Sequence, residues 1–271
     1  NISLTAISII NVLILSLYFT INYNKLDNFQ IKLTILVGIY TFVCAIRSIW
    51  PRIDNTRLCF YKNIISLPIV GRALATIAEL SFILLIVLIN KKILVNFNIF
   101  SNKRFNIKSL LTINGILFPI IVFAQICCWI GVITTDHLWN AVEESMWAGF
   151  GILSIVLYII LFVFICKVGK LNGQTKLVKI LIPFMILILI GYVVFMIMVD
   201  VPMYLKNSNK HDGNYMGLKN GIIDLCKCKK VTSSFKEWKE DIPWLTGYFT
   251  LAVWASIGLL IWYGKYKNLS A

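Results

Sequence analysis

Long runs of apolar residues alternate with short polar segments along this chain. A membrane span needs about 20 mostly apolar residues, and seven runs meet that length. They cover residues 2–22, 30–50, 65–90, 109–133, 137–166, 178–200 and 242–263. Backbone groups inside lipid must be hydrogen-bonded within a helix or a closed barrel, and runs this long satisfy that requirement as helices. The pattern predicts an all-α fold, a single transmembrane bundle of seven helices over residues 1–271.

One polar segment is much longer than the others and covers residues 201–241, which we expect to lie outside the membrane. Within it, Ser234 precedes Glu237 by three positions, which is the pattern of a helical capping box. Phe235 and Trp238 would then share one face of that helix. The segment therefore predicts a short interfacial helix that leads into the last span.

The composition supports a membrane protein. The chain is 59% hydrophobic and 14% charged, whereas soluble domains are typically about 45–50% apolar and about 25% charged. One soluble core cannot bury this excess. The net charge of +14 does not indicate nucleic-acid binding, because the basic residues lie in short loops between the apolar runs. The first run lacks a basic leader and a small-residue cleavage site, so we interpret it as a span and not as a signal peptide.

The charge of the loops predicts how the chain is oriented. Lysine and arginine accumulate near residues 23–29, 91–108 and 167–177 and in the C-terminal tail, where Asp27 is the only acid. Short loops rich in lysine and arginine stay in the cytosol. We therefore expect a non-cytosolic N-terminus and a cytosolic C-terminus. Which membrane holds the chain is left open.

Three cysteines fall on the predicted non-cytosolic side. Cys59 lies in the loop of residues 51–64, and Cys226 and Cys228 lie in the long polar segment. If that compartment is oxidising, Cys59 is expected to form a disulfide with Cys226 or with Cys228; free thiols are the alternative. A zinc site would need a second cysteine pair, which is missing here.

Ionisable residues of the spans gather toward this same side, whereas the stretches 151–166, 180–199 and 251–263 carry no charge, so the inner half of the bundle looks dry. A charge inside a span costs roughly 2.5–3.5 kcal/mol on insertion scales, so such residues usually face protein, water or a ligand. The acids outnumber the arginines, which predicts that at least one carboxyl group is protonated, metal-bound or in contact with water. The residues are Arg47, Arg72, Glu79, Asp136, His137, Glu143, Glu144 and Asp200.

Helical spacing arranges these side chains on faces. Arg72 and Glu79 are seven positions apart and share a face of the third span. His137 and Glu144 share a face of the fifth span, from which Glu143 points about 100° away. We expect Arg72 to pair with an acid from the fifth or sixth span. Together these residues predict a polar cavity that opens to the non-cytosolic side; an ion-pair network that only holds the helices together is the alternative.

The predicted roles follow from the chemistry of the side chains. Glu79, Glu144 and His137 are the candidate catalytic residues, since carboxyl and imidazole groups exchange protons. Glu143 and Asp136 are expected to be structural. The candidate substrate-binding residues are Arg47, Arg72, Asp200 and Tyr204.

No cofactor motif is present in the sequence. The spacing of His137, Glu143 and Glu144 does not match the two histidines of an HExxH zinc site, and no metal site is predicted. The chain also lacks a P-loop, a dinucleotide-binding fingerprint, a GxSxG motif and a CxxC pair. The identity of any cofactor is therefore left open.

Four short strings resemble a family of uncharacterised multi-pass membrane proteins. They are "RSIWPRID", "GRALATIAEL", "EESMW" and "DVPMYL", and they begin at residues 47, 71, 143 and 200. The family brings no activity to this chain. The resemblance implies only that the four strings form one site.

Three classes of function fit the sequence. The first is a membrane-embedded enzyme that acts on a lipid or another hydrophobic substrate. The second is a receptor without catalytic activity, or a subunit of a larger membrane complex. The third is a proton-coupled transporter, which the uncharged inner halves of the spans disfavour because a conduction path needs polar groups along its length. The lipid bilayer is the expected partner in each case.

Overall fold

The computed structural model describes residues 2–100, 107–168, 173–210, 215–239 and 241–268. Parts of the basic loops that carry the predicted orientation, residues 101–106 and 169–172, lie outside the described residues. The helices are α1 Ile2–Asn22, α2 Asn28–Ile49, α3 Pro68–Phe100, α4 Ile107–Thr134, α5 His137–Val168, α6 Gly173–Phe195, α7 Val201–Lys210, α8 Leu218–Leu225, α9 Phe235–Trp238, α10 Ile242–Thr246 and α11 Ala252–Asn268. The remaining elements are a 3₁₀ turn η1 Tyr23–Lys25, two π turns, η2 Met196–Asp200 and η3 Gly247–Leu251, and the strands β1 Arg52–Ile53, β2 Leu58–Cys59 and β3 Lys230–Val231.

Seven helical segments among the described residues are long and apolar enough to cross a membrane, which confirms the predicted all-α class. They are Ile2–Lys25, Asn28–Ile49, Pro68–Asn96, Lys108–Thr134, His137–Lys167, Thr175–Asn209 and Trp244–Lys267. Two helices extend well beyond the predicted limits. α3 continues ten residues past position 90 to Phe100, and the sixth span continues past Asp200 through Lys210.

The π turn η2 explains why the sixth span does not end at Asp200. Pro202 has no N–H group to donate to the carbonyl four residues back, and its ring would clash with that carbonyl. The backbone widens just before Pro202, so that the N–H of Val201 donates to the carbonyl of Met196, five residues back. A π turn absorbs one extra residue without breaking the helix. The last span contains a second such turn, η3, between α10 and α11.

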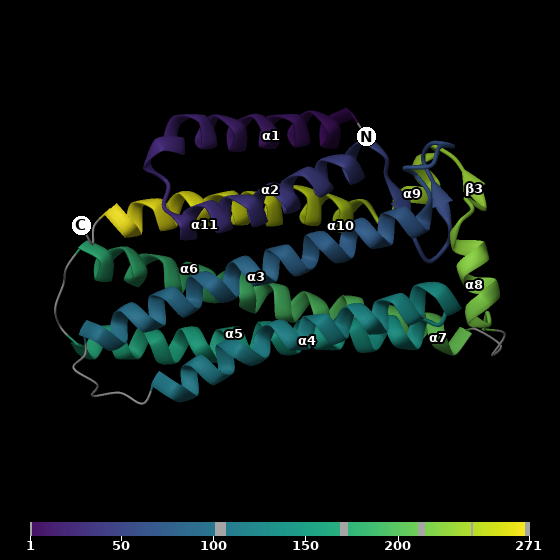
Figure 1. The fold of residues 1–271 in the computed structure, drawn as a ribbon. Coiled ribbons are helices and arrows are strands. Elements are labelled where there is room, and N and C mark those ends of the chain that lie inside the picture. The colour runs from purple at the N-terminus through teal and green to yellow at the C-terminus, as the bar shows by residue number, and fades with distance from the viewer. Residues whose placement is uncertain (1, 101–106, 169–172, 211–214, 240, 269–271) are drawn as a thin grey trace. The chain divides into compact units, whose positions relative to one another are not determined.

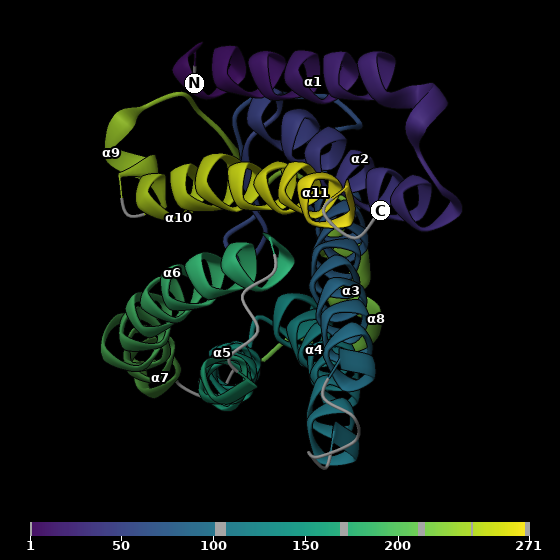
Figure 2. The ribbon, with the colours of Figure 1, turned by 90° about the vertical axis from the view of Figure 1, so that its left-hand side faces the viewer.

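The chain forms two compact units. Unit 1 comprises Asn1–Leu85, Val132–Thr135 and Tyr215–Trp262, and unit 2 comprises Ile86–Gly131, Asp136–Asn214 and Tyr263–Ala271. In unit 1, α1 packs against α2 and η3, as the views in Figures 1 and 2 show for α1 and α2. The buried face of α2 includes Leu33, Val37 and Tyr40, a spacing of four and three residues that places them on one stripe of the helix.

In unit 2, α5 packs against α6, η2 and α7 (Figure 2). Gly151 of α5 allows this close approach, since a methyl group there would overlap the side chain of Val193 on α6. The hydroxyl of Tyr158 donates to Asn90 Oδ1 at 3.1 Å, and Asn114 Nδ2 donates to the carbonyl of Val87 at 3.0 Å. Tyr158 belongs to the uncharged stretch of residues 151–166, which is therefore less dry than its sequence suggested.

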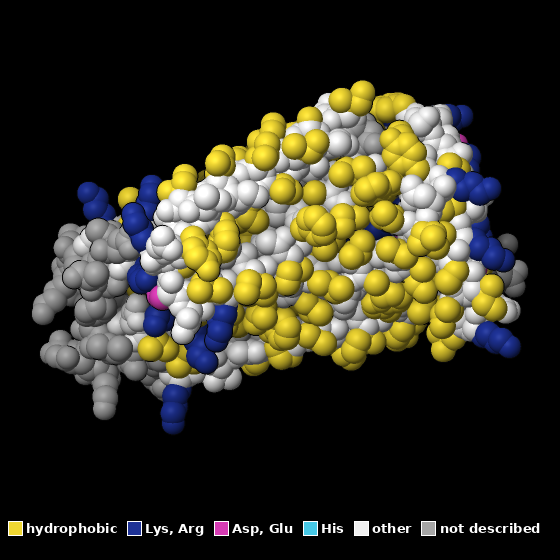
Figure 3. Space-filling view, turned by 45° about the horizontal axis from the view of Figure 1, so that its top comes forward, with side chains coloured by type: hydrophobic (Ala, Val, Ile, Leu, Met, Phe, Trp, Pro, Cys, Tyr) yellow, Lys and Arg dark blue, Asp and Glu magenta, His cyan; other side chains and the backbone are white. Residues whose placement is uncertain are grey.

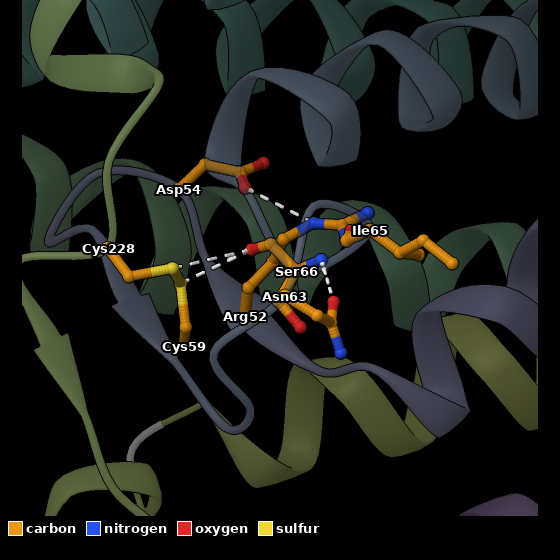
Figure 4. The surroundings of a disulfide bond; sticks show 7 residues. All are labelled: Arg52, Asp54, Cys59, Asn63, Ile65, Ser66 and Cys228. Atoms are coloured by element: carbon orange, nitrogen blue, oxygen red, sulfur yellow. Dashed lines mark hydrogen bonds and ion pairs between the residues drawn. A yellow bond between two sulfur atoms is a disulfide. The ribbon is translucent and has the colours of Figure 1, made fainter.

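A small module outside the spans of unit 1 was not predicted. We call it the disulfide module; it consists of β1, β2, β3, α8 and α9. β1 pairs with β2 in antiparallel orientation, and β2 pairs with β3 in parallel orientation. A disulfide joins Cys59 to Cys228 (Figure 4), which confirms one of the two predicted pairings. Cys226 is an exposed free thiol.

Arg57 holds the disulfide module together from inside. Its side chain is fully buried. Its Nε lies 3.1 Å from Asp224 Oδ2 on α8, its Nη2 donates to the carbonyl of Val132 at 2.8 Å, and its Nη1 donates to the carbonyl of Asp54. Burial lowers the pKa of Arg57, and the charge of Asp224 counteracts this shift. One guanidinium group thereby connects three segments that are distant in sequence.

Arg52 lies across the start of α3. Its Nη1 donates to the carbonyl of Ile65, and its Nε lies 3.8 Å from Asp54 Oδ1 (Figure 4). The Ser66 carbonyl oxygen lies 3.2 Å from Cys59 Sγ; a disulfide sulfur has no proton, so this is a contact and not a hydrogen bond. A methyl group at Gly71 would overlap Arg52 Nε. Glycine is therefore required at this position by the arginine that crosses it.

The short helix before the last span is present as α9, but the predicted capping box is not formed. Ser234 is the N-cap residue, yet its side chain makes no capping hydrogen bond. Glu237 instead pairs with Lys230 at 2.8 Å, and this pairing lowers the pKa of Glu237. Trp238 is buried and donates from Nε1 to the carbonyl of Thr232 at 2.9 Å, whereas Phe235 is 71% exposed. Glu237 thus pairs with Lys230, and Trp238 with the Thr232 carbonyl, in place of the capping box that the sequence predicted.

The surface in Figure 3 fits the membrane setting that the spans indicate. Hydrophobic side chains cover the middle of this face, and lysine and arginine side chains lie toward its two ends. Among the exposed apolar residues are Leu13 and Leu17 of α1. Exposed apolar surface of this extent is expected where lipid is the solvent.

The contact between Arg52 and Gly71 gives a stability prediction. Gly71→Ala should destabilise unit 1 by about 1–3 kcal/mol, because the added methyl group displaces a buried guanidinium. Gly38→Ala in α2 is the matched control, since nothing lies within 4 Å of the added carbon, and it should be neutral or stabilising by up to about 1 kcal/mol. Thermal unfolding of the purified proteins in one detergent measures both, and equal stability of the two variants would contradict the prediction.

Candidate functional sites

A buried ion pair lies within α3. Arg72 and Glu79 are seven residues apart, two helical turns, and Arg72 Nη2 lies 3.1 Å from Glu79 Oε2 and 3.2 Å from Oε1. Each residue is 7% exposed. The sequence predicted that both would share one face, but it predicted a partner for Arg72 from the fifth or sixth span. The structure pairs Arg72 with Glu79 of its own helix.

Two tyrosines extend this ion pair, and we call the four residues the Arg72 cluster. The hydroxyl of Tyr248 donates to Glu79 Oε1 at 3.1 Å. Tyr248 belongs to the π turn η3, and its backbone carbonyl accepts a hydrogen bond from the Tyr40 hydroxyl at 3.4 Å. Tyr40 in turn stacks on Phe82, with ring centroids 4.9 Å apart. The cluster therefore ties α2, α3 and η3 to one another within unit 1.

Arg47 is held next to this cluster by aromatic rings. Its Cζ lies 5.5 Å from the ring centroid of Tyr248 and 5.4 Å from that of Phe249, within the range of cation–π attraction. Among the described residues, no carboxylate forms an ion pair with Arg47. Of the two arginines predicted to bind a substrate, Arg72 is thus already matched by an acid, whereas Arg47 keeps its charge available.

A second group of polar residues lies in unit 2, and we call it the Tyr204 cluster. It contains Tyr204 of α7, Asp200 of the π turn η2, and Glu143, Glu144 and His137 of α5. Asp200 is 1% exposed, and Glu143 and Glu144 are 5% and 9% exposed. α5 packs against η2 and α7, and the rings of His137 and Tyr204 have centroids 6.0 Å apart.

The two adjacent glutamates of α5 point to different sides of the helix. Consecutive helical positions point about 100° apart. Glu144 shares a face of α5 with His137, whose ring centroid lies 6.0 Å from that of Tyr204. Glu143 points to a different side of α5 and is 5% exposed.

Asp136 immediately precedes α5 and is placed to stabilise its start. Its Oδ1 accepts a hydrogen bond from the N–H of Leu138 at 2.9 Å, which satisfies a backbone donor at the helix start. Asn140, one turn into α5, is buried against Gly131 of α4, where a methyl group would come within 2.9 Å of Asn140 Oδ1. Both residues serve the close packing at this end of α5.

The Tyr204 cluster is suited to moving protons. Carboxyl, phenol and imidazole groups all act as general acids or bases when they are within reach of a substrate. The stretches 137–166 and 180–205, which supply the cluster, contain no lysine or arginine. Among the described residues, no group of three or more His, Cys, Asp and Glu side chains is arranged to hold a metal ion.

The four strings of the family resemblance lie in two pairs in the structure. "RSIWPRID" and "GRALATIAEL" both belong to unit 1, where Arg52 of the first lies against Gly71 of the second. "EESMW" and "DVPMYL" both belong to unit 2 and supply the acids and the tyrosine of the Tyr204 cluster. Each pair therefore contributes to one local arrangement.

Comparison with known proteins gives no relative: no family model, no curated protein and no solved structure matches this chain. The function has to be inferred from the chemistry of the two clusters.

Sequence reasoning missed Arg52 and Arg57. Both lie in the loop that was assigned to the non-cytosolic side, and charged loop residues are ordinarily solvated. No local pattern marks them as buried, although "RID" and "NTR" place two arginines around a tight turn in which Arg57 has a positive φ of 56°. Non-glycine residues with positive φ are uncommon, but φ cannot be read from the sequence.

The Arg72 cluster gives a prediction about stability. Glu79→Gln should destabilise unit 1 by about 3–5 kcal/mol, because it leaves the buried guanidinium of Arg72 without its counter-charge. The double variant Arg72→Met/Glu79→Gln should recover a large part of that loss, since it removes both charges. Tyr248→Phe removes one hydrogen bond and should cost about 1 kcal/mol.

Thermal unfolding of the wild type, Glu79→Gln, Arg72→Met and the double variant completes a double-mutant cycle. If the stability lost by the double variant equals the sum of the losses in Glu79→Gln and Arg72→Met, the two side chains do not interact, contrary to the geometry.

Proposed function

We propose that this protein is a membrane-embedded enzyme that acts on a lipid or another hydrophobic substrate, with the Tyr204 cluster as its acid–base site. The observation that carries the proposal is the presence of three acids, each less than 10% exposed, on α5 and on the π turn η2 that packs against it. A chain that only needed to cross lipid would gain nothing from such a group, because burying carboxyl groups is costly. Proton transfer to and from a substrate gives the group a purpose.

In this proposal the residues have separate roles. Glu144, which shares a face of α5 with His137, acts as the general acid or base, and His137 relays the proton to or from the surrounding water. Tyr204 and Asp200 position the substrate through its polar atoms. Glu143 points to a different side of α5 and serves mainly to hold the helices, and Asp136 stabilises the start of α5.

We also propose that the N-terminus and the disulfide module lie on the non-cytosolic side. The lysine bias of the short loops supports this orientation. The disulfide between Cys59 and Cys228 supports it independently, because disulfides form and persist in oxidising compartments and are rare in the cytosol. Both cysteines come from segments that the charge bias alone assigned to that side.

A proton-coupled transporter is the second candidate, and one observation favours it. The hydrogen bond between Tyr158 and Asn90 places polar groups in the inner part of unit 2, where the sequence had suggested a dry region. Against transport, Val193 fills the space beside Gly151 between that pair and the acids of α5. A receptor or complex subunit has no specific observation in its favour, since lipid covers exposed apolar faces equally well.

The orientation predicts which positions react with a membrane-impermeant maleimide. In a background with the exposed thiols Cys166 and Cys226 replaced by serine, Lys219→Cys on α8 should be labelled from outside in intact cells or sealed vesicles of native orientation. Lys108→Cys at the start of α4 should be labelled only after the membrane is permeabilised. If position 108 is labelled before position 219, the orientation is the opposite of the proposed one.

The acid–base role predicts opposite effects of two neighbouring substitutions. In vesicles of phosphatidylethanolamine and phosphatidylglycerol, the wild-type protein should convert lipid to a product detectable by mass spectrometry. Glu144→Gln should lower the rate by about 100-fold or more, the scale of general acid–base catalysis. Glu143→Gln should chiefly lower the yield of folded protein and change the rate per folded molecule by only a few-fold.

The same vesicles, loaded with a pH-sensitive dye, separate the two candidates. If protons cross the membrane in a way that depends on Glu144, and the lipids do not change, the protein is a transporter and the enzyme proposal is wrong. If Glu143→Gln and Glu144→Gln match the parent protein in yield, stability, lipid turnover and proton movement, the cluster has no functional role.

A further inference from the structure

Two arginines near the end of α2 carry more positive charge than their surroundings neutralise. Arg47 lies in the last turn of α2, half-buried, with its guanidinium over the rings of Tyr248 and Phe249. These rings hold the group in place without neutralising it. No described carboxylate pairs with Arg47, so its N–H groups are available to a ligand.

Arg52 follows five residues later, at the start of β1, and is only 3% exposed. One side of its guanidinium is engaged: Nη1 donates to the carbonyl of Ile65, and Nε lies 3.8 Å from Asp54 Oδ1. Nε and Nη2 are both buried and have no hydrogen-bond partner among the described residues. A buried guanidinium N–H without an acceptor is unusual in a folded protein, and an oxygen atom from outside the chain can accept from it.

Arg47 in the last turn of α2 and Arg52 at the start of β1 are five residues apart in the chain. Burial lowers the pKa of Arg52 to about 10; the positive charge of Arg47 lowers it further, and Asp54 opposes the shift. Asp54 is the only carboxylate among the described residues that forms an ion pair with either arginine. Two cations therefore face one acid, which leaves a positive charge for an anion to neutralise.

We propose that Arg47 and Arg52 form a binding site for a phosphate group. The planar guanidinium N–H groups match the oxygens of phosphate, which makes arginine the preferred residue for such recognition. The pair stands where the second span ends, at Ile49, which is the level of the lipid headgroups. The phosphate comes from a lipid headgroup or from free phosphate in the aqueous phase, and the recognition chemistry is the same.

The sequence placed Arg47 and Arg72 among the candidate substrate-binding residues. Arg72 is matched by Glu79, and the second arginine of this site is Arg52. Gly71 contributes by leaving room for Arg52 to lie across α3. The inference deepens the proposed function by specifying phosphate chemistry, and it rests on that function only for the membrane setting.

Binding can be tested on the purified full chain without any turnover. Native mass spectrometry with dioleoyl phosphatidic acid or dioleoyl phosphatidylcholine gives the lipid arm. Thermal unfolding in sodium phosphate against sodium chloride of equal ionic strength gives the free-phosphate arm. We expect the wild-type protein to bind phosphatidic acid in preference to phosphatidylcholine, or to be stabilised by inorganic phosphate, and the arm that responds identifies the source.

Three variants decide whether the two arginines are responsible. Arg47→Gln should weaken the responding arm by about tenfold or more, since hydrogen bonds to charged groups are worth that much. Lys62→Gln removes an exposed cation from the same loop and should change binding by less than about twofold on the scale of exposed charges. Arg52→Lys keeps the charge but loses Nη2 and should weaken binding as well; if it does not fold, Arg47→Gln decides alone.

The outcomes are distinguishable from those of the enzyme test. Loss of phosphate binding in Arg47→Gln, with lipid turnover absent from every protein, supports this site and removes the proposed function. Equal binding by wild type and Arg47→Gln overturns the site, as does an equal loss in Lys62→Gln, which would show general attraction to a basic surface. A wild-type protein that responds in neither arm also overturns it.

Discussion

A bilayer provides no hydrogen-bond partner for a polar group, and the polar residues of this protein are arranged under that constraint. The spans satisfy their backbones as helices. In unit 1, Glu79 accepts from both Arg72 and Tyr248, and the rings of Tyr248 and Phe249 hold Arg47. In unit 2, Asn90 is bonded to Tyr158. Side chains from different helices thereby fix which faces of the spans meet.

Both clusters take a residue from a π turn. Asp200 closes η2 and Tyr248 lies within η3. A π turn rotates the side chains that follow it relative to a regular helix, so it can aim Tyr204 at His137 of α5 and Tyr248 at Glu79. In the sixth span, Pro202 gives a direct reason for the wider turn. The feature that keeps the helix continuous through proline is thus also the feature that positions candidate functional residues, and π turns are frequent at functional sites.

The disulfide module shows how loops outside the spans become rigid. The Cys59–Cys228 bond joins two segments that are 169 residues apart, and Arg57 binds the same segments through Asp224 and also reaches Val132 of α4. This rigidity matters for Arg52, because a side chain with a buried guanidinium N–H that lacks an acceptor can be held in place only by a firm surrounding. The carbonyl of Ile65 and the space above Gly71 provide that surrounding.

The sequence by itself determined the class of the protein and the positions of its spans, because the length of an apolar run needed to cross lipid is a one-dimensional property. It also determined that Arg72 and Glu79 share a face and that Glu143 and Glu144 do not, since helical periodicity decides both. It could not determine which partners meet. The pairing of Arg72 with Glu79, the approach of His137 to Tyr204, and the choice of Cys228 over Cys226 depend on contacts between segments far apart in the chain. The same is true of Arg52 and Arg57, whose burial arises only when β1, β2 and α8 come together; their local sequence is that of a solvated loop.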